Sequence, residues 1–411
     1  MGRKVLLLLA VAAMMAACGL EEIGGGPESG NGVWFGPGNL VSGNGSGLGP
    51  GVPDGVGRKV WYAVGVDYQD GYDWREDKQK GSVRCSLVVF ANGIPMMKVP
   101  VGDEYEVSAD PDMHRMIGNN LYTDYSTDSE TVIKRNGETL FRYPAREAIV
   151  DMSVDGDCVY TLGQSRGGDG FSFRANGQPL MEKAGGYVFP HLYRGEDGYS
   201  FAFCEIIGKG DKATERYYHY LAGESVQVAV REDIIKVWDI VYRDDKLCYL
   251  ASMVGISSPV LAVDGVLSPL MVPENTEVKS CRFLPGTQNL DIECMLLQRR
   301  KRLFSGLWRG CDLVAAFPSG YTVASMCSGD DGLSCILNSS GADAPGIIYR
   351  CGESYEVPAG YISMGGRSMA MIDGLLHVGL TSKSEGGAAV WVENEMKPMK
   401  INGFISHISA D

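Results

Sequence analysis

Residues 88–97 read VVFANGIPMM, in which one apolar strand pattern is followed by Asn92-Gly93 and then by a second strand pattern. Residues 132–141 repeat this arrangement as VIKRNGETLF, with Asn136-Gly137 at the centre. Asn-Gly between two such runs indicates a β-hairpin, because both central residues of a type I′ turn need a positive φ. A hairpin that recurs along the chain is therefore the feature that decides the fold.

The hairpin returns throughout the chain at a regular interval. The other copies are residues 171–180 (FSFRANGQPL), 218–227 (YHYLAGESVQ), 260–269 (VLAVDGVLSP), 306–315 (GLWRGCDLVA), 347–356 (IIYRCGESYE) and 390–399 (VWVENEMKPM). A second hairpin precedes each of the later copies, as in MSVDGDCVYTLG at residues 152–163. Each unit thus holds four short strands in about 43 residues, which is typical of a propeller blade.

The two ends of the repeat array complement each other. The first unit begins at residue 58 with a second-strand pattern and has no first strand before it. The chain ends with GFISHI at residues 403–408, which matches the first strands of other units. We therefore predict an all-β fold, a single β-propeller over residues 58–411 with eight four-stranded blades, closed by the C-terminal strand. Seven blades, with one degenerate unit, is the alternative.

The N-terminal segment has the pattern of a secretory signal. Arg3 and Lys4 precede an apolar run at residues 5–13, and Met15-Ala16-Ala17 ends it before Cys18. Residues 19–57 contain 15 glycines and no periodic apolar pattern, so this segment cannot bury enough surface to offset its ordering entropy. We predict a signal peptide at residues 1–17, a flexible tether at 18–57 and the propeller at 58–411.

Two resemblances add to these patterns. Cys18 after two alanines resembles a bacterial lipobox, which implies lipidation of Cys18 and a membrane anchor; Gly19 resembles the outer-membrane sorting signal, with a periplasmic or surface-exposed domain. The blades resemble the β-propeller lipoproteins of unknown function of Bacteroidota, through Val154-Asp155-Gly156 with Val159-Tyr160 and through Trp391 before Glu393-Asn394. The second resemblance implies the fold and is nearly silent on function.

Net charge narrows the classes of partner. The chain carries 37 basic and 51 acidic residues, a formal charge of −14, so it has no general attraction for nucleic acid. We expect a non-catalytic binding or scaffold module for a glycan, a peptide or a partner protein. The alternative is a propeller enzyme, a lyase or glycoside hydrolase with carboxylates near the channel mouth.

The candidate binding residues on the loops lie between second and third strands. The longest such loop offers aromatic rings beside carboxylates, a combination suited to a glycan or peptide; its candidates are Tyr68, Asp70, Tyr72, Asp73 and Trp74. A basic run in the sixth unit, with Arg299, Arg300 and Arg302, suits a phosphate, sulfate or uronate. For both loops a solvated, non-binding loop is the alternative.

A third set of candidates comes from the inner strands. Alignment of the units places Asp151, His191, Asp239, Ser325 and His407 at a similar depth, where they would hold a ligand or hydrogen-bond water in the channel. We expect no metal site and no cofactor, since the zinc patterns CxxC and HExxH are missing from the sequence. The cysteines recur at equivalent strand positions, which favours packing as small apolar groups; Cys327 and Cys335 are the one pair placed to bridge.

Overall fold

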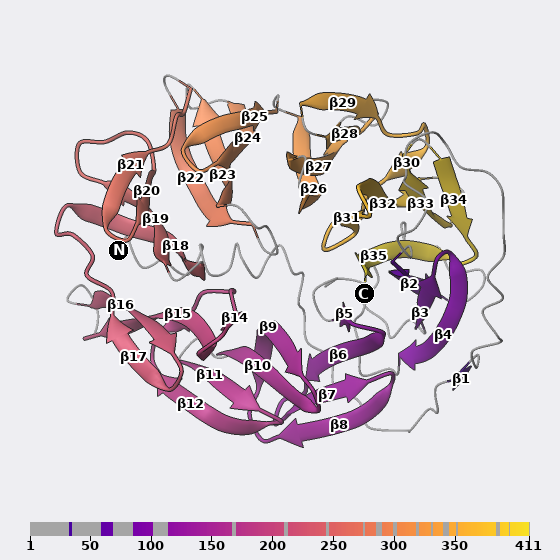
Figure 1. Cartoon of the computed structure of the whole chain (residues 1–411), viewed down its shortest axis with the longest axis horizontal. Helices are drawn as coiled ribbons and strands as arrows, with labels where there is room; N and C mark the ends of the chain where they lie inside the picture. The colour runs from indigo at the N-terminus through magenta and orange to yellow at the C-terminus, as the bar shows by residue number, and fades with distance from the viewer. Residues whose placement is uncertain are drawn as a thin grey trace.

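The computed structural model describes residues 33–34, 59–68, 85–101, 114–166, 170–208, 213–243, 246–273, 276–284, 290–298, 302–317, 320–329, 332–339, 345–350, 352–383, 387–393 and 395–410. The regular structure of these residues is β-strand, arranged in eight sheets. Figure 1 shows the sheets standing around a common centre, as the blades of a propeller do. The predicted all-β fold with eight blades is therefore confirmed. No helix in the described ranges is long and apolar enough to cross a membrane.

Each blade is an antiparallel sheet whose strands follow one another from the centre of the ring outward. Blade 1 contains β35 (Gly403–Ala410), β2 (Trp61–Tyr68), β3 (Cys85–Ala91), β4 (Ile94–Val101) and β1 (Val33–Trp34). Blade 2 contains β5 (His114–Ile117), β6 (Asn120–Ser126), β7 (Thr131–Arg135) and β8 (Glu138–Tyr143). Blade 3 contains β9 (Glu147–Asp155), β10 (Cys158–Ser165), β11 (Gly170–Ala175) and β12 (Gln178–Ala184). Blade 4 contains β13 (Tyr187–Val188) and β14 (Tyr193–Gly195), both paired with β15 (Gly198–Ile207), then β16 (Thr214–Leu221) and β17 (Glu224–Gln227).

The second half of the ring follows the same plan. Blade 5 contains β18 (Ile234–Arg243), β19 (Lys246–Met253), β20 (Val260–Val263) and β21 (Val266–Pro269). Blade 6 contains β22 (Thr276–Phe283), β23 (Asp291–Gln298), β24 (Arg302–Arg309) and β25 (Asp312–Ala316). Blade 7 contains β26 (Tyr321–Gly329), β27 (Gly332–Ser339), β28 (Ile347–Arg350) and β29 (Glu353–Glu356). Blade 8 contains β30 (Tyr361–Ile362) and β31 (Met369–Ile372), both paired with β32 (Leu375–Ser382), then β33 (Ala388–Val392) and β34 (Glu395–Met399).

The ring is closed by strands from the two ends of the propeller. β35 pairs antiparallel with β2 from Trp61 opposite Ala410 to Asp67 opposite Gly403. Figure 1 shows yellow β35 beside indigo β2. The predicted closure is confirmed, and it leaves the innermost edge of β2 covered by a partner strand. On the outer edge of the same blade, Val33 and Trp34 pair with β4, so a piece of the predicted tether adds a fifth strand.

The hairpin turns use Asn and Asp for two physical reasons. Asn92, Asn136, Asn176 and Asp264 all have φ between 47° and 54°, each followed by a glycine with positive φ, as a type I′ turn requires. Their side-chain oxygens also accept a backbone N–H at the start of the second strand of the same blade. Each turn residue therefore ties the outer hairpin to an inner strand.

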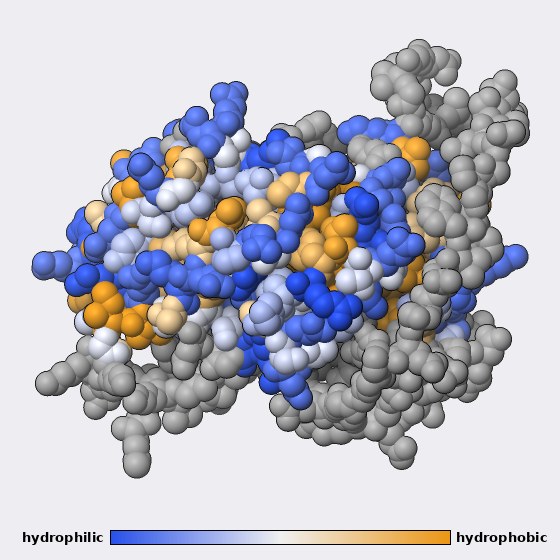
Figure 2. All heavy atoms as spheres, turned by 90° about the horizontal axis from the view of Figure 1, so that it is seen from below, coloured by the Kyte–Doolittle hydropathy of each residue, from blue (hydrophilic) through white to orange (hydrophobic). Residues whose placement is uncertain are grey.

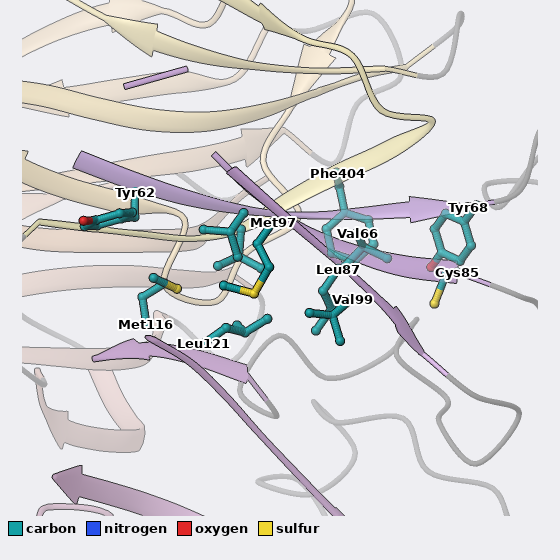
Figure 3. Packing of buried hydrophobic residues seen from close by; sticks show 12 residues of the cluster. Tyr62, Val66, Tyr68, Cys85, Leu87, Met97, Val99, Met116, Leu121 and Phe404 are labelled. Carbon is teal, nitrogen blue, oxygen red and sulfur yellow. The ribbon is translucent and has the colours of Figure 1, made fainter. Parts of the chain in front are cut away.

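The hydrophobic core is divided among the gaps between blades. Eight clusters of buried residues occupy the described part of the chain, and each lies between two neighbouring blades. Figure 3 shows the cluster between blades 1 and 2, where Val66 and Met97 of blade 1 lie near Met116 and Leu121 of blade 2. This packing leaves the inner rim of the ring to polar side chains. The side view in Figure 2 shows hydrophilic residues interspersed with apolar ones over the rim of the ring.

Candidate functional site

A β-bulge recurs in five of the inner strands. The strand pairing shifts by one residue at Val150, Trp238, Lys279, Ala324 and Ser406. The residues that follow these bulges are Asp151, Asp239, Ser280, Ser325 and His407. A bulge bends the strand and re-aims the next side chain. Four of the five inner-strand candidates thus share one structural position, in agreement with the similar depth expected from alignment of the units.

Blades 4 and 8 interrupt the inner strand at the same level. In blade 4 residues 189–192 separate β13 from β14, and in blade 8 residues 363–368 separate β30 from β31. Three blades lie between these two interruptions in either direction around the ring, so they face each other across the axis. His191, the fifth inner-strand candidate, lies in the blade 4 segment.

The carboxylates of Asp151 and Asp239 connect neighbouring blades. Asp151 Oδ1 accepts the N–H of Met152, and its Oδ2 accepts the N–H of Leu192 in blade 4 at 2.8 Å. Asp239 Oδ1 accepts the N–H of Ile240, and its Oδ2 accepts the N–H of Phe283 in blade 6 at 2.8 Å. Both carboxylates therefore satisfy backbone donors of the interior that would be costly to leave unpaired.

His191 and Asp239 form an ion pair between blades 4 and 5. Nε2 of His191 lies 2.9 Å from Oδ2 of Asp239. Burial lowers the pKa of His191, but the charge of Asp239, the hydrogen bond to it and the charge of Asp151 together raise that pKa above its ordinary value. The carboxylate of Asp239 is therefore the counter-ion of the buried His191 imidazolium.

A contact between blades 8 and 3 crosses the centre of the ring. Arg367 Nη2 lies 3.9 Å from Asp151 Oδ1, although blades 1 and 2 separate these two residues along the shorter arc. The segment that carries Arg367 is fixed at its base, because Ser325 Oγ donates to Gly366 O and the N–H of Ile408 donates to Arg367 O. At this level the central opening is spanned by protein.

His407 lies on β35, the innermost strand of blade 1. It pairs in register with Val64, and only 5% of its surface is exposed. Within the described residues neither ring nitrogen has a hydrogen-bond partner. Burial holds the pKa of His407 well below its ordinary value, and the charges of Arg367, His114 and Arg115 lower it further.

The neighbouring histidine of blade 2 is hydrogen-bonded. His114 Nε2 contacts Ser406 Oγ, and Ser406 Oγ donates to Val64 O at 3.0 Å. Since the serine proton is used by the carbonyl, Nε2 of His114 is the donor to Ser406. Beside it, Arg115 donates from Nη1 to Asp124 at 3.1 Å and from Nη2 to Ile149 O at 3.2 Å.

The loop candidates lie largely outside this cluster. Tyr68 is 4% exposed and its ring centroid lies 6.4 Å from that of Phe404, inside the cluster between blades 1 and 2. Arg302 begins β24, and its side chain is not among those described. The remaining candidates lie outside the described residues: Cys18, Asp70, Tyr72, Asp73, Trp74, Arg299 and Arg300.

The structure contains a disulfide that the sequence pattern did not indicate. Cys281 of β22 and Cys294 of β23 face each other in register and are bonded. Cys327 and Cys335 are not bonded to each other, because Cys335 lies opposite Met326 and Cys327 opposite Ser334. The pairing depends on strand register, which sequence spacing alone leaves open by one residue. Within the described ranges no group of three or more His, Cys, Asp or Glu side chains is placed to hold a metal ion.

Comparisons with known proteins show similarity of structure alone. No protein-family model matches the chain, and no curated protein matches it. Among solved structures, dihydro-heme d1 dehydrogenase NirN is 12% identical with a TM-score of 0.48, over 85% of this chain and 75% of that one. Pyrococcus horikoshii acylaminoacyl peptidase is 10% identical with a TM-score of 0.45, over 82% of this chain and only 56% of the peptidase. Kluyveromyces lactis Hsv2 is 10% identical with a TM-score of 0.39, over 71% of this chain and 94% of that one.

Proposed function

We propose that this protein is a lipid-anchored propeller of the bacterial cell envelope that acts as a binding or scaffold module. The observation that carries the proposal is that polar residues near the axis join the blades to one another. Asp151 and Asp239 join neighbouring blades through backbone N–H groups, and Arg367 reaches Asp151 across the centre. These contacts favour a rigid ring, and loops held by a rigid scaffold are where binding residues usually lie.

The binding surface in this proposal is the loop face, the side of the ring that carries the loops between second and third strands and the links between blades. Tyr72 and Trp74 with Asp70 and Asp73 are its proposed glycan or peptide contacts, and Arg299 and Arg300 its anion contacts. On the same face blade 5 exposes Ile235 and Val254, by 63% and 65%. Their exposure supports contact with a ligand or partner that has apolar groups.

The anchor in this proposal is a lipid on Cys18, which holds the propeller at the outer membrane through the segment 18–57. Metabolic labelling with a palmitate analogue checks the anchor, and we expect the label to be lost in Cys18→Ser. Labelling that persists in the variant, or that never occurs in the unchanged chain, contradicts it.

The binding proposal is tested by presenting the full chain in detergent to arrays of glycans and of peptides. We expect specific capture that weakens about tenfold or more in Trp74→Ala, a change of ~1.4 kcal/mol in binding free energy. Tyr355→Ala is the matched control, because Tyr355 lies on β29 at the outer edge of blade 7. Equal capture by the unchanged chain and Trp74→Ala removes this loop from the site, and no capture on either array contradicts the binding function.

A further inference from the structure

Two histidines of the inner rim, His191 and His407, differ in whether the imidazole has a hydrogen-bond partner. His191 has a carboxylate partner in Asp239 at 2.9 Å. His407 is buried, yet both of its ring nitrogens lack a partner among the described residues. An imidazole always has one N–H donor to satisfy, and a buried donor without a partner costs about 1–3 kcal/mol. Within the described part of the chain, the position that Asp239 fills for His191 has no counterpart at His407.

The groups that act on the ring of His407 are basic, and two of them also have carboxylate partners: Arg115 donates to Asp124, and Arg367 lies 3.9 Å from Asp151. The ionisable groups that act on its ring are Arg367, His114 and Arg115. His114 of blade 2 contacts Ser406, the residue before His407, and the backbone of Arg367 lies beside that of His407 in a parallel bridge. The chain as a whole carries a formal charge of −14, so this basic surrounding is a local property. The basic groups favour an anion over a cation as the partner of the His407 ring, and the carboxylates of Asp124 and Asp151 reduce that preference.

We propose that His407 is the centre of a buried binding site for a small oxyanion, a carboxylate or a phosphate group. The anion accepts a hydrogen bond from the imidazole of His407, and Arg367, His114 and Arg115 supply the positive potential. The site lies inside the ring and is independent of the loop-face binding proposed above. In this proposal the bulge at Ser406 directs the side chain of His407 toward the anion.

Proton linkage gives the proposal a specific sign. Without an anion the imidazolium form of His407 is disfavoured, because burial and the basic neighbours oppose a further positive charge. A bound anion compensates that charge, so binding raises the pKa of His407 and takes up a proton. Anion affinity therefore increases as pH falls, up to about tenfold per pH unit.

The test follows the histidine ring resonances of the full chain by NMR while sodium acetate or inorganic phosphate replaces chloride at constant ionic strength. The chain has five histidines, and His407→Gln assigns the signal. We expect a saturable shift of the His407 signal, an upward movement of its pKa when the anion binds, and tighter binding at the acidic end of a pH series than at its neutral end. The acetate and phosphate series distinguish a carboxylate site from a phosphate site.

Two further variants keep the test decisive. Arg367→Gln leaves the His407 ring in place and is expected to weaken anion binding about tenfold, whereas His219→Gln, on the third strand of blade 4, leaves binding unchanged. The proposal is overturned if both anions leave the His407 resonance and its pKa as they are in chloride. It is also overturned if a crystal structure at high phosphate or acetate shows water only, or an adventitious ion only, beside the ring.

Discussion

The charge of each histidine at the inner rim depends on the groups that its blade position brings near. His191 meets Asp239 from blade 5, and His407 meets basic groups from blades 2 and 8. Their pKa values therefore move in opposite directions, although burial acts on both rings in the same sense. Both side chains titrate because both are imidazoles, and the neighbouring charges decide whether the pKa is raised or lowered.

The His191–Asp239 pair predicts a pH-dependent stability. The folded-state pKa of His191 is raised, so its contribution is complete below the unfolded pKa of about 6.5 and is lost as pH rises through the folded value. We expect the stability difference between the unchanged chain and His191→Gln to be largest near about pH 6 and to shrink by about pH 9. Thermal melts of both proteins at several pH values check this. A difference that grows with rising pH would falsify the assignment.

At the level of the hairpin, one side chain does two tasks. Asn136 adopts φ of 54° and its Oδ1 accepts the N–H of Leu121 at 2.9 Å. In blade 4 the same turn position is held by Ala222, at φ of 50°, whose N–H donates to Tyr199 O but which has no side-chain acceptor. The repeat therefore contains a natural comparison between a complete turn and an incomplete one.

This comparison predicts mutations of opposite sign. Asn136→Ala is expected to destabilise the protein by about 1–2 kcal/mol, because a hydrogen bond is lost and alanine disfavours the left-handed region. Asn136→Gly keeps the conformation and isolates the hydrogen-bond contribution. Ala222→Asn is expected to stabilise by about 1 kcal/mol through a new bond to the N–H of Tyr199. Chemical denaturation measures all three, and a destabilising Ala222→Asn would show that the two turns are not equivalent.

At the level of the whole molecule, stability depends on closure of the ring. β35 contributes Phe404 to the buried cluster between blades 1 and 2. It contributes Ile405 and Ile408 to the buried cluster between blades 8 and 1. The buried apolar side chains of each blade pack on its two neighbours, so an open ring exposes two apolar faces at once.

Truncation after Asn402 tests this closure. We expect a loss of roughly 5 kcal/mol or more, since three large apolar side chains lose their burial at ~1.5–3 kcal/mol each. The matched control is a circular permutant that links Ala410 to Lys59 and opens the chain between Lys400 and Gly403, which keeps β2 to β35 and omits β1. Equal melting of the truncated chain and the full chain would contradict a role for β35 in holding the ring together.

The sequence by itself determined the repeat and the hairpin turns, because these depend on contacts within about 43 residues. It favoured eight blades and left seven as the alternative, which the structure decided. Asn-Gly pairs and alternating strands specify them locally, and the pattern at residues 403–408 also indicated closure. Alignment of the units likewise placed Asp151, His191, Asp239 and His407 at one depth.

Only the tertiary structure decided what those residues contact. It paired His191 with Asp239, brought Arg367 to Asp151 across the ring and left the ring nitrogens of His407 without a described partner. It also set the register that bonds Cys281 to Cys294. Such contacts join residues of different blades or depend on single-residue bulges, and a periodic pattern specifies neither. The physical reason is that a repeat encodes the blade, whereas charge and hydrogen bonding at the axis depend on all eight blades together.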